Sequence, residues 1–162
     1  MALQDLQRIS APNRDRSSAL ATALALLALV GCARDSSTTT PISCTRGPTE
    51  VRSALAQAPG EVRLAGKRIS ECFVRGAGSS AVQEVGLVFV PVADRLAAEA
   101  RTKPAGPSAL RLGFLMGAIR RGVADTQGIY SELLRRLRQE LIGVNLRSPA
   151  YLRGERAGSD HG

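Results

Sequence analysis

Apolar side chains recur three or four residues apart in four segments of the chain after residue 47. This spacing places them on one face of a helix. Pro48 and Pro107 stand where the first and third helices would begin, a position that suits proline. The pattern predicts a mainly α domain of three to four helices. The four sets are Val51, Leu55 and Ala58; Val82, Val85, Phe89, Leu96 and Ala100; Leu112, Leu115, Met116, Ile119 and Val123; and Ile129, Leu133, Leu137 and Leu141.

The second segment contains a proline that conflicts with a smooth helix. Pro91 lacks a backbone N–H and its ring clashes with the preceding turn. A strand over 86–90 is the alternative, because Leu87 to Val90 is a continuous apolar run. Ser80 and Gln83 have the spacing of a capping box at a helix start. This capping pattern and the long helical spacing favour a kinked helix.

Shorter features complete the predicted fold. Residues 62–74 alternate in part and carry Gly66 at a turn, which is compatible with a short β-hairpin. Gly113 and Gly117, four residues apart, would leave a groove on their helix and allow close packing against a neighbour. Residues 108–142 could form one helix, or two that meet near 125–128, with Asp125 as a cap.

Two segments have the composition of unfolded chain. Residues 33–43 are rich in Ser and Thr and lack apolar periodicity, so we expect 32–43 to be a flexible tether. Residues 147–162 contain several glycines and are expected to be a disordered tail. The predicted domain therefore covers 44–146.

The chain begins with a segment typical of export. Ala19 to Val30 is an apolar run interrupted only by Thr22, and Arg14 and Arg16 precede it. The run is too short for a transmembrane helix, which needs about 20 apolar residues. It has the length of the apolar core of a secretory signal peptide.

Leu29-Val30-Gly31-Cys32 directly ends this run. The tetrapeptide resembles the lipobox of bacterial lipoproteins, in which a signal peptidase cleaves before the cysteine. The resemblance implies that 1–31 is a signal peptide, cleaved between Gly31 and Cys32, and that Cys32 becomes the lipidated N-terminus. Cys32 would then carry a thioether-linked diacylglycerol and usually an N-acyl chain such as palmitate. The resemblance covers the leader only, and no family is recognised for the rest of the chain.

The chain has three cysteines. If Cys32 carries lipid, Cys44 and Cys72 remain as a pair, and export would take them to an oxidising compartment where such pairs form disulfides. A zinc site is the competing interpretation, but no histidine or third cysteine lies near either residue. The sequence therefore predicts one structural disulfide that pins the domain.

Composition argues against several functions. Aromatic residues make up 3% of the 162 residues and Trp is absent, so base stacking and a nucleic-acid partner are not expected. The one histidine, His161, lies in the predicted tail, which leaves catalytic triads and histidine metal sites without a partner. Lys67 and Lys103 could supply the lysine of a Ser–Lys catalytic dyad by residue type. Both stand at predicted turns, however, where a lysine is normally solvated. We therefore expect no enzymatic activity, cofactor or metal.

Basic residues outnumber acidic ones by 22 to 14. The favoured interpretation of this charge is a solvated basic surface without a dedicated partner. The protein would be an exported lipoprotein, anchored on the extracytoplasmic face of the cell membrane. Its role would be a structural, binding or accessory one in the cell envelope. Its partners would be membrane lipid and an envelope protein or anionic polymer. The alternative is a binder of an anionic envelope ligand or lipid head groups through the arginines of an Arg-rich helical face. These arginines are Arg111, Arg120, Arg121, Arg135, Arg136 and Arg138.

Overall fold

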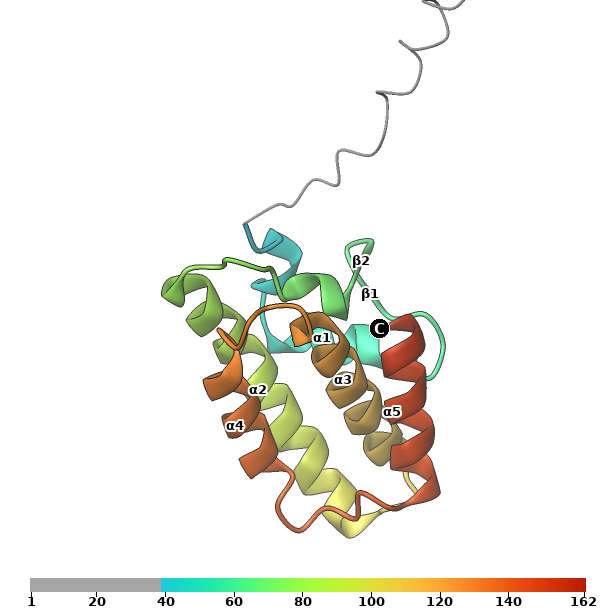
Figure 1. Cartoon of the computed structure of the whole chain (residues 1–162). Helices are drawn as coiled ribbons and strands as arrows, with labels where there is room; N and C mark the ends of the chain where they lie inside the picture. Colours follow the sequence, from blue (N-terminus) through green and yellow to red (C-terminus); the bar gives the residue numbers. More distant parts are fainter. Residues whose placement is uncertain (1–38) are drawn as a thin grey trace, which may run out of the picture. The chain divides into compact units, whose positions relative to one another are not determined.

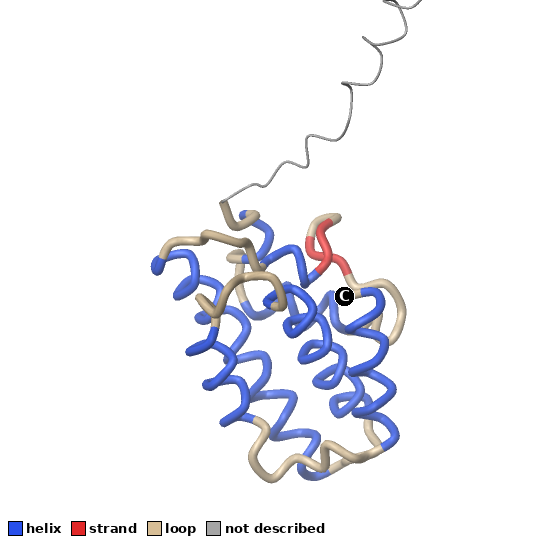
Figure 2. Tube along the Cα trace, in the orientation of Figure 1, coloured by secondary structure: helices blue, strands red, loops and turns tan. Residues whose placement is uncertain are grey.

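The computed structural model describes residues 39–162 of the chain. In this part the chain forms five α-helices, two 3-10 helices and one two-stranded antiparallel hairpin (Figures 1 and 2). The mainly α fold with a short hairpin is confirmed. The predicted signal peptide of 1–31 and the lipid attachment at Cys32 lie outside the described residues.

The elements follow one another with short connections. In chain order they are η1 (Ile42–Cys44), α1 (Pro48–Leu55), β1 (Arg63–Leu64), β2 (Lys67–Arg68), η2 (Ile69–Cys72), α2 (Ser79–Thr102), α3 (Pro107–Val123), α4 (Ser131–Glu140) and α5 (Pro149–His161). In the hairpin, Arg63 faces Arg68 and Leu64 faces Lys67. The ordered chain already includes η1, where Ser43 is buried, so the predicted tether is too long at this end.

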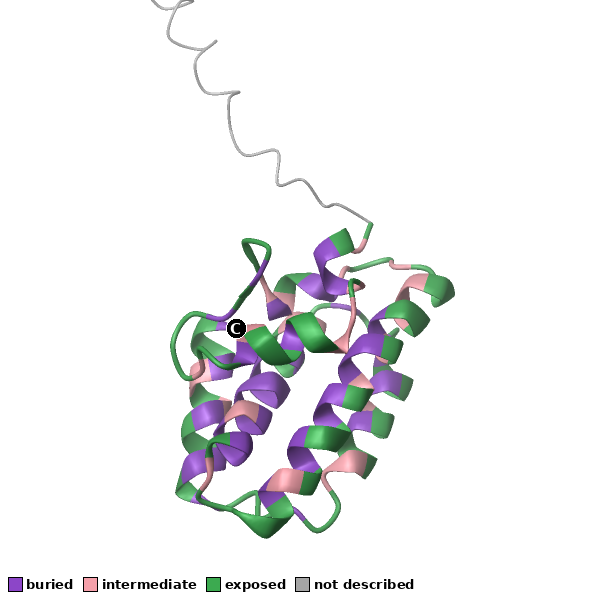
Figure 3. Cartoon of the chain, turned by 180° about the vertical axis from the view of Figure 1, so that it is seen from behind, coloured by how far each residue is buried: buried purple, intermediate pink, exposed green. Residues whose placement is uncertain are grey.

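Helix α3 lies at the centre of the fold. It packs against α2 on one side and α5 on the other, and α4 lies on the far side of α2 (Figure 1). Figure 3 shows the buried residues of these helices turned toward one another and the exposed ones toward solvent. Burial of these apolar faces contributes about 25 cal/mol for each Å² removed from water.

The five aromatic side chains are all buried. Phe73, which follows η2, packs between Phe89 of α2 and Tyr130, with ring centroids 5.6 Å and 5.3 Å away. Burial raises the pKa of Tyr130, and the neighbouring Val74 backbone and Thr40 hydroxyl offset part of that rise. Burial likewise raises the pKa of Tyr151 in α5 to about 12.

Helices α3 and α5 meet backbone to backbone at their glycines. A Cβ on Gly113 would lie 2.1 Å from the Tyr151 carbonyl oxygen, and one on Gly154 would lie 1.9 Å from the Leu110 oxygen. Gly117 and Gly158 make equally close approaches. No side chain larger than hydrogen fits at these positions, so the predicted close packing of the Gly113–Gly117 face is confirmed.

The prediction that residues 147–162 form a disordered tail is wrong. They contain α5, in which Ala150, Tyr151, Gly154 and Gly158 are buried. Glycine favours disorder in an isolated segment because it has much conformational entropy to lose. Here the glycines of α5 fit those of α3, and the close packing offsets that cost. The Ser148 hydroxyl also caps α5 by accepting a hydrogen bond from the Tyr151 N–H.

Helix α2 runs through Pro91 without interruption, which excludes the strand alternative for 86–90. Pro91 and Leu87 are both exposed. Water can therefore reach the carbonyl that Pro91 leaves without its N–H donor. The predicted capping box is wrong, because Gly78 is the N-cap and no side-chain cap bond forms there.

Residues 108–142 form two helices. The connection between α3 and α4 includes Gln127 and Gly128, both with positive φ (54° and 83°). A helix cannot continue through two left-handed residues. The suggested cap at Asp125 is wrong, since α4 begins after Tyr130 and has no side-chain cap there.

The predicted disulfide between Cys44 and Cys72 is confirmed. Both residues are fully buried. The bond joins η1 to η2 and so closes a loop that contains α1 and the hairpin. It fixes the start of the domain to the segment that packs on α3.

We predict opposite effects of one substitution at two helical glycines. Gly113→Ala should lower the free energy of unfolding by about 1–3 kcal/mol, because its Cβ would overlap the backbone of α5. Gly86→Ala should raise it by about 0.5–1 kcal/mol, because alanine favours a helix and its Cβ would lie 3.7 Å from Leu133 Cδ1. Chemical denaturation measures both. A Gly113→Ala variant as stable as the wild type would contradict the close contact.

Removing the disulfide should destabilise the domain by restoring entropy to the unfolded chain. The bond joins residues 28 apart, and a loop of that length corresponds to about 3.5 kcal/mol. The variant Cys44→Ala/Cys72→Ala should therefore unfold at lower denaturant concentration than the oxidised wild type. A reductant should lower the wild-type midpoint and leave the variant unchanged. Equal midpoints for oxidised wild type and variant would refute this role.

Candidate functional site

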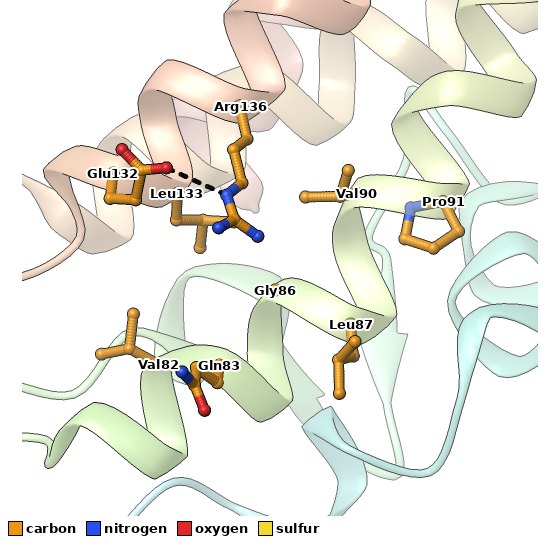
Figure 4. A pocket seen from close by; sticks show the side chains of 9 residues that line it. All are labelled: Val82, Gln83, Gly86, Leu87, Val90, Pro91, Glu132, Leu133 and Arg136. Atoms are coloured by element: carbon orange, nitrogen blue, oxygen red, sulfur yellow. Dashed lines mark hydrogen bonds and ion pairs between the residues drawn. The ribbon is translucent and has the colours of Figure 1, made fainter.

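A groove of about 490 Å³ runs between α2 and α4. Figure 4 shows its lining residues, which come from 82–91 of α2 and 132–136 of α4. We call it the α2–α4 groove. Six of its residues are apolar or lack a side chain: Val82, Gly86, Leu87, Val90, Pro91 and Leu133. The other three are Gln83, Glu132 and Arg136.

The groove exists because α2 presents apolar residues beyond those that face the core. Val85 and Phe89 are fully buried, whereas Leu87 is 74% exposed. Gly86 supplies no side chain, so a strip of α2 opposite Leu133 stays open. An apolar surface of this kind that α4 only partly covers can accept an apolar ligand.

Two charged residues of α4, Glu132 and Arg136, lie at the edge of the groove, and Arg135 bonds the same Glu132 carboxylate. Glu132 accepts hydrogen bonds from Arg135 at 2.7 and 2.8 Å and from Arg136 at 3.0 Å. These hydrogen bonds, first that of Arg135 and then that of Arg136, lower the pKa of Glu132 to about 2. Two guanidinium groups therefore share one carboxylate, and this edge keeps a net positive charge at neutral pH.

Both ends of α4 are fixed to the rest of the domain. At the start, the hydroxyl of the buried Tyr130 accepts a hydrogen bond from the Val74 N–H at 3.1 Å. At the end, Arg101 of α2 donates to the carbonyl oxygens of Glu140 (2.7 Å) and Ile142 (2.9 Å). These contacts set the separation of α4 from α2, so the groove is preformed.

The six arginines predicted to form one anion-binding face lie on two separate helices. Arg111, Arg120 and Arg121 belong to α3, and the other three belong to α4 on the far side of α2 (Figure 1). Arg120 pairs with Glu155, and Arg121 donates to the carbonyl oxygens of Ser159 and Asp160. The structure thus brings Arg136 to the groove, pairs Arg135 with the groove residue Glu132, and engages Arg120 and Arg121 with α5.

Arg111 has a different setting. It is half-buried and contributes to two surface hollows of about 310 and 330 Å³. Arg52 of α1 lines one hollow and Arg153 of α5 lines the other. Within residues 39–162 none of these three guanidinium groups has an ion pair. Sequence reasoning missed Arg52 and Arg153 because they belong to α1 and α5, which come near Arg111 of α3 only in the folded domain.

Glu99 is the carboxylate beside this site. It accepts a hydrogen bond from Ser108 and pairs with Arg95 at 3.0 Å. These contacts, first that of Ser108, lower the pKa of Glu99. The charge of Glu99 is therefore bonded by Ser108 and Arg95 and also attracts Arg52, but neither Arg52 nor Arg111 forms an ion pair within residues 39–162.

Other chemistry that the sequence raised has a clear place in the fold. His161 is exposed near the end of α5. In the part of the chain that the structure describes, no three His, Cys, Asp or Glu side chains cluster in a way that could hold a metal ion. Within that same part, no helix combines the length and the apolar character needed to cross a membrane.

Comparison of the chain with family models, with curated proteins and with solved structures gave no match. The groove and the hollows therefore carry the functional argument on their own geometry.

The signal for the groove was present in the sequence. The run Leu87 to Val90 is apolar on more faces than one buried stripe requires.

Proposed function

We propose that the protein is an exported lipoprotein, anchored to the extracytoplasmic face of a cell membrane through Cys32, with a non-catalytic binding or accessory role in the cell envelope. Its basis in the sequence is the apolar run that ends in Leu29-Val30-Gly31-Cys32. A lipid with two or three acyl chains holds a protein on a membrane far more firmly than a single chain.

The buried Cys44–Cys72 disulfide is the structural observation that most supports this proposal. Disulfides form and persist in oxidising compartments and are rare in the cytosol. A protein that depends on this bond would need to leave the cytosol to fold, and the leader would provide that route. The odd cysteine, Cys32, is then the one that takes the lipid.

A binding role agrees with the kinds of surface that the domain offers. The α2–α4 groove is apolar and the hollows around Arg111 are basic. Among the described residues that line the α2–α4 groove there is no serine, threonine, cysteine or lysine nucleophile of the kind that covalent catalysis uses. These surfaces suit recognition of a ligand more than its chemical conversion.

The anchor predicts the mass of the mature N-terminus. Mass spectrometry of the membrane fraction should find Cys32 as an acylated first residue, without residues 1–31. Cys32→Ala should prevent this processing and acylation, and Cys44→Ala should leave the acylation of Cys32 intact. An unmodified Cys32 within an uncleaved chain would refute the proposed function.

A second candidate function, binding of an anionic envelope ligand, is favoured by the unpaired Arg52, Arg111 and Arg153 around the two adjoining hollows. Arginine binds phosphate and carboxylate groups through two parallel hydrogen bonds. Because Arg111 contributes to both hollows, it would contact such a ligand on either side.

We predict that Arg111→Gln weakens retention of the protein on immobilised polyphosphate. Arg156→Gln is the matched control, because Arg156 is an exposed arginine of α5 without an ion pair in the described chain. Both variants lose one charge, so nonspecific attraction should fall equally. A lower elution salt concentration for Arg111→Gln than for Arg156→Gln would support the site. Identical elution of the two variants would argue against it.

A further inference from the structure

We propose that the α2–α4 groove binds one acyl chain of an anionic membrane lipid. The inference rests on the proposed function for the source of the ligand, since an anchored protein stays beside lipid. The fit between groove and ligand depends only on the described residues. Three features carry it: the apolar lining, the size, and the charge at the edge.

The lining matches a hydrocarbon chain. Val82, Val90 and Leu133 form the sides, and Gly86 leaves the floor open between them (Figure 4). The polar groups of the lining are Gln83, Glu132 and Arg136, and the last two are paired with each other. An acyl chain in this groove would exchange water for apolar contacts without breaking a hydrogen bond.

The size favours a small ligand over a protein. The volume of about 490 Å³ falls in the range of roughly 300–1,000 Å³ that is typical of small-molecule sites. A stable protein partner typically buries about 800 Å² on each side. Among the lining residues, Leu87 alone is a large aliphatic side chain exposed by more than half. The groove therefore offers too little apolar surface for a protein interface.

The charge at the edge selects the head group. Arg135 and Arg136 share the carboxylate of Glu132, which leaves one positive charge uncompensated. Arg136 bonds Glu132 through Nε, and its two terminal nitrogens have no hydrogen-bond partner within residues 39–162. They can donate to the phosphate of an anionic lipid. A zwitterionic head group would gain less from this contact.

The groove also lies at a suitable end of the domain. The chain enters at Thr39, at the end where α2 and α4 begin (Figures 1 and 3). Six residues lie between Cys32 and Thr39, and the seven residue steps from one to the other span at most about 25 Å when fully extended. An anchor at Cys32 would thus keep the groove within reach of the bilayer surface.

The test uses the protein purified from the membrane fraction of cells that express the whole chain, placed in vesicles that contain phosphatidylglycerol with a photoreactive group in one acyl chain. Vesicles with the corresponding phosphatidylcholine probe are run in parallel. After irradiation, mass spectrometry locates the labelled peptides. We expect labelling of α2 and α4 peptides, stronger with phosphatidylglycerol. Gly86→Leu, which fills the groove, should reduce it at least about tenfold.

Matched variants separate the groove from general effects. Ala98→Leu enlarges an exposed residue of α2 away from the groove and should leave labelling unchanged. Arg136→Gln should remove the preference for phosphatidylglycerol, and Arg156→Gln should retain it. The labelled peptides of the wild type decide the matter even if a variant fails to fold.

Several results would overturn the inference: wild-type label confined to peptides outside α2 and α4, equal labelling with both probes, or unchanged labelling in a folded Gly86→Leu variant. The state of Cys32 is measured in the same digest. An unmodified Cys32 would refute the anchor while the labelled peptides still report on the groove. Failure of the proposed function and failure of the groove are thus distinguishable.

Discussion

The fold depends on the direct contact between the backbones of α3 and α5. Glycines on both helices bring main-chain atoms to distances that any larger residue would prevent. α5 covers one side of α3, and α2 covers the other. α4 packs on a further face of α2, and the groove lies between these two helices. The position of the candidate site therefore follows from how the central helix is covered.

Much of the helical part of the fold could be predicted from local pattern. The helices were predictable from signals within short segments, namely the apolar spacing in α2, α3 and α4 and the prolines that begin α1 and α3. The disulfide pair was inferred by elimination, because Cys32 was assigned to the lipid. α5 was missed because its stability comes from a partner far along the chain. Gly154 and Gly158 carry no apolar signal of their own. Their value lies in the match with Gly113 and Gly117, which only the folded structure reveals.

The candidate site was predictable only in part. Arg135 and Arg136 were identified as members of a basic face, but their shared bond to Glu132 and their place beside an apolar groove depend on how α4 packs. Arg120 and Arg121 are also arginines, but they bond Glu155 and the Ser159 carbonyl oxygen and so hold α3 to α5. Arginine content alone therefore could not separate binding residues from structural ones, since the difference lies in neighbours contributed by other helices.

Hydrogen exchange of the α5 amides tests the α3–α5 contact most directly. If α5 packs on α3 as described, the amides of 153–158 should exchange as slowly as those in the middle of α3, because both open only when the domain unfolds. If 147–162 were a loosely attached segment, they would exchange at nearly the rate of unfolded chain while α3 stayed protected. Fast exchange confined to α5 would contradict the account.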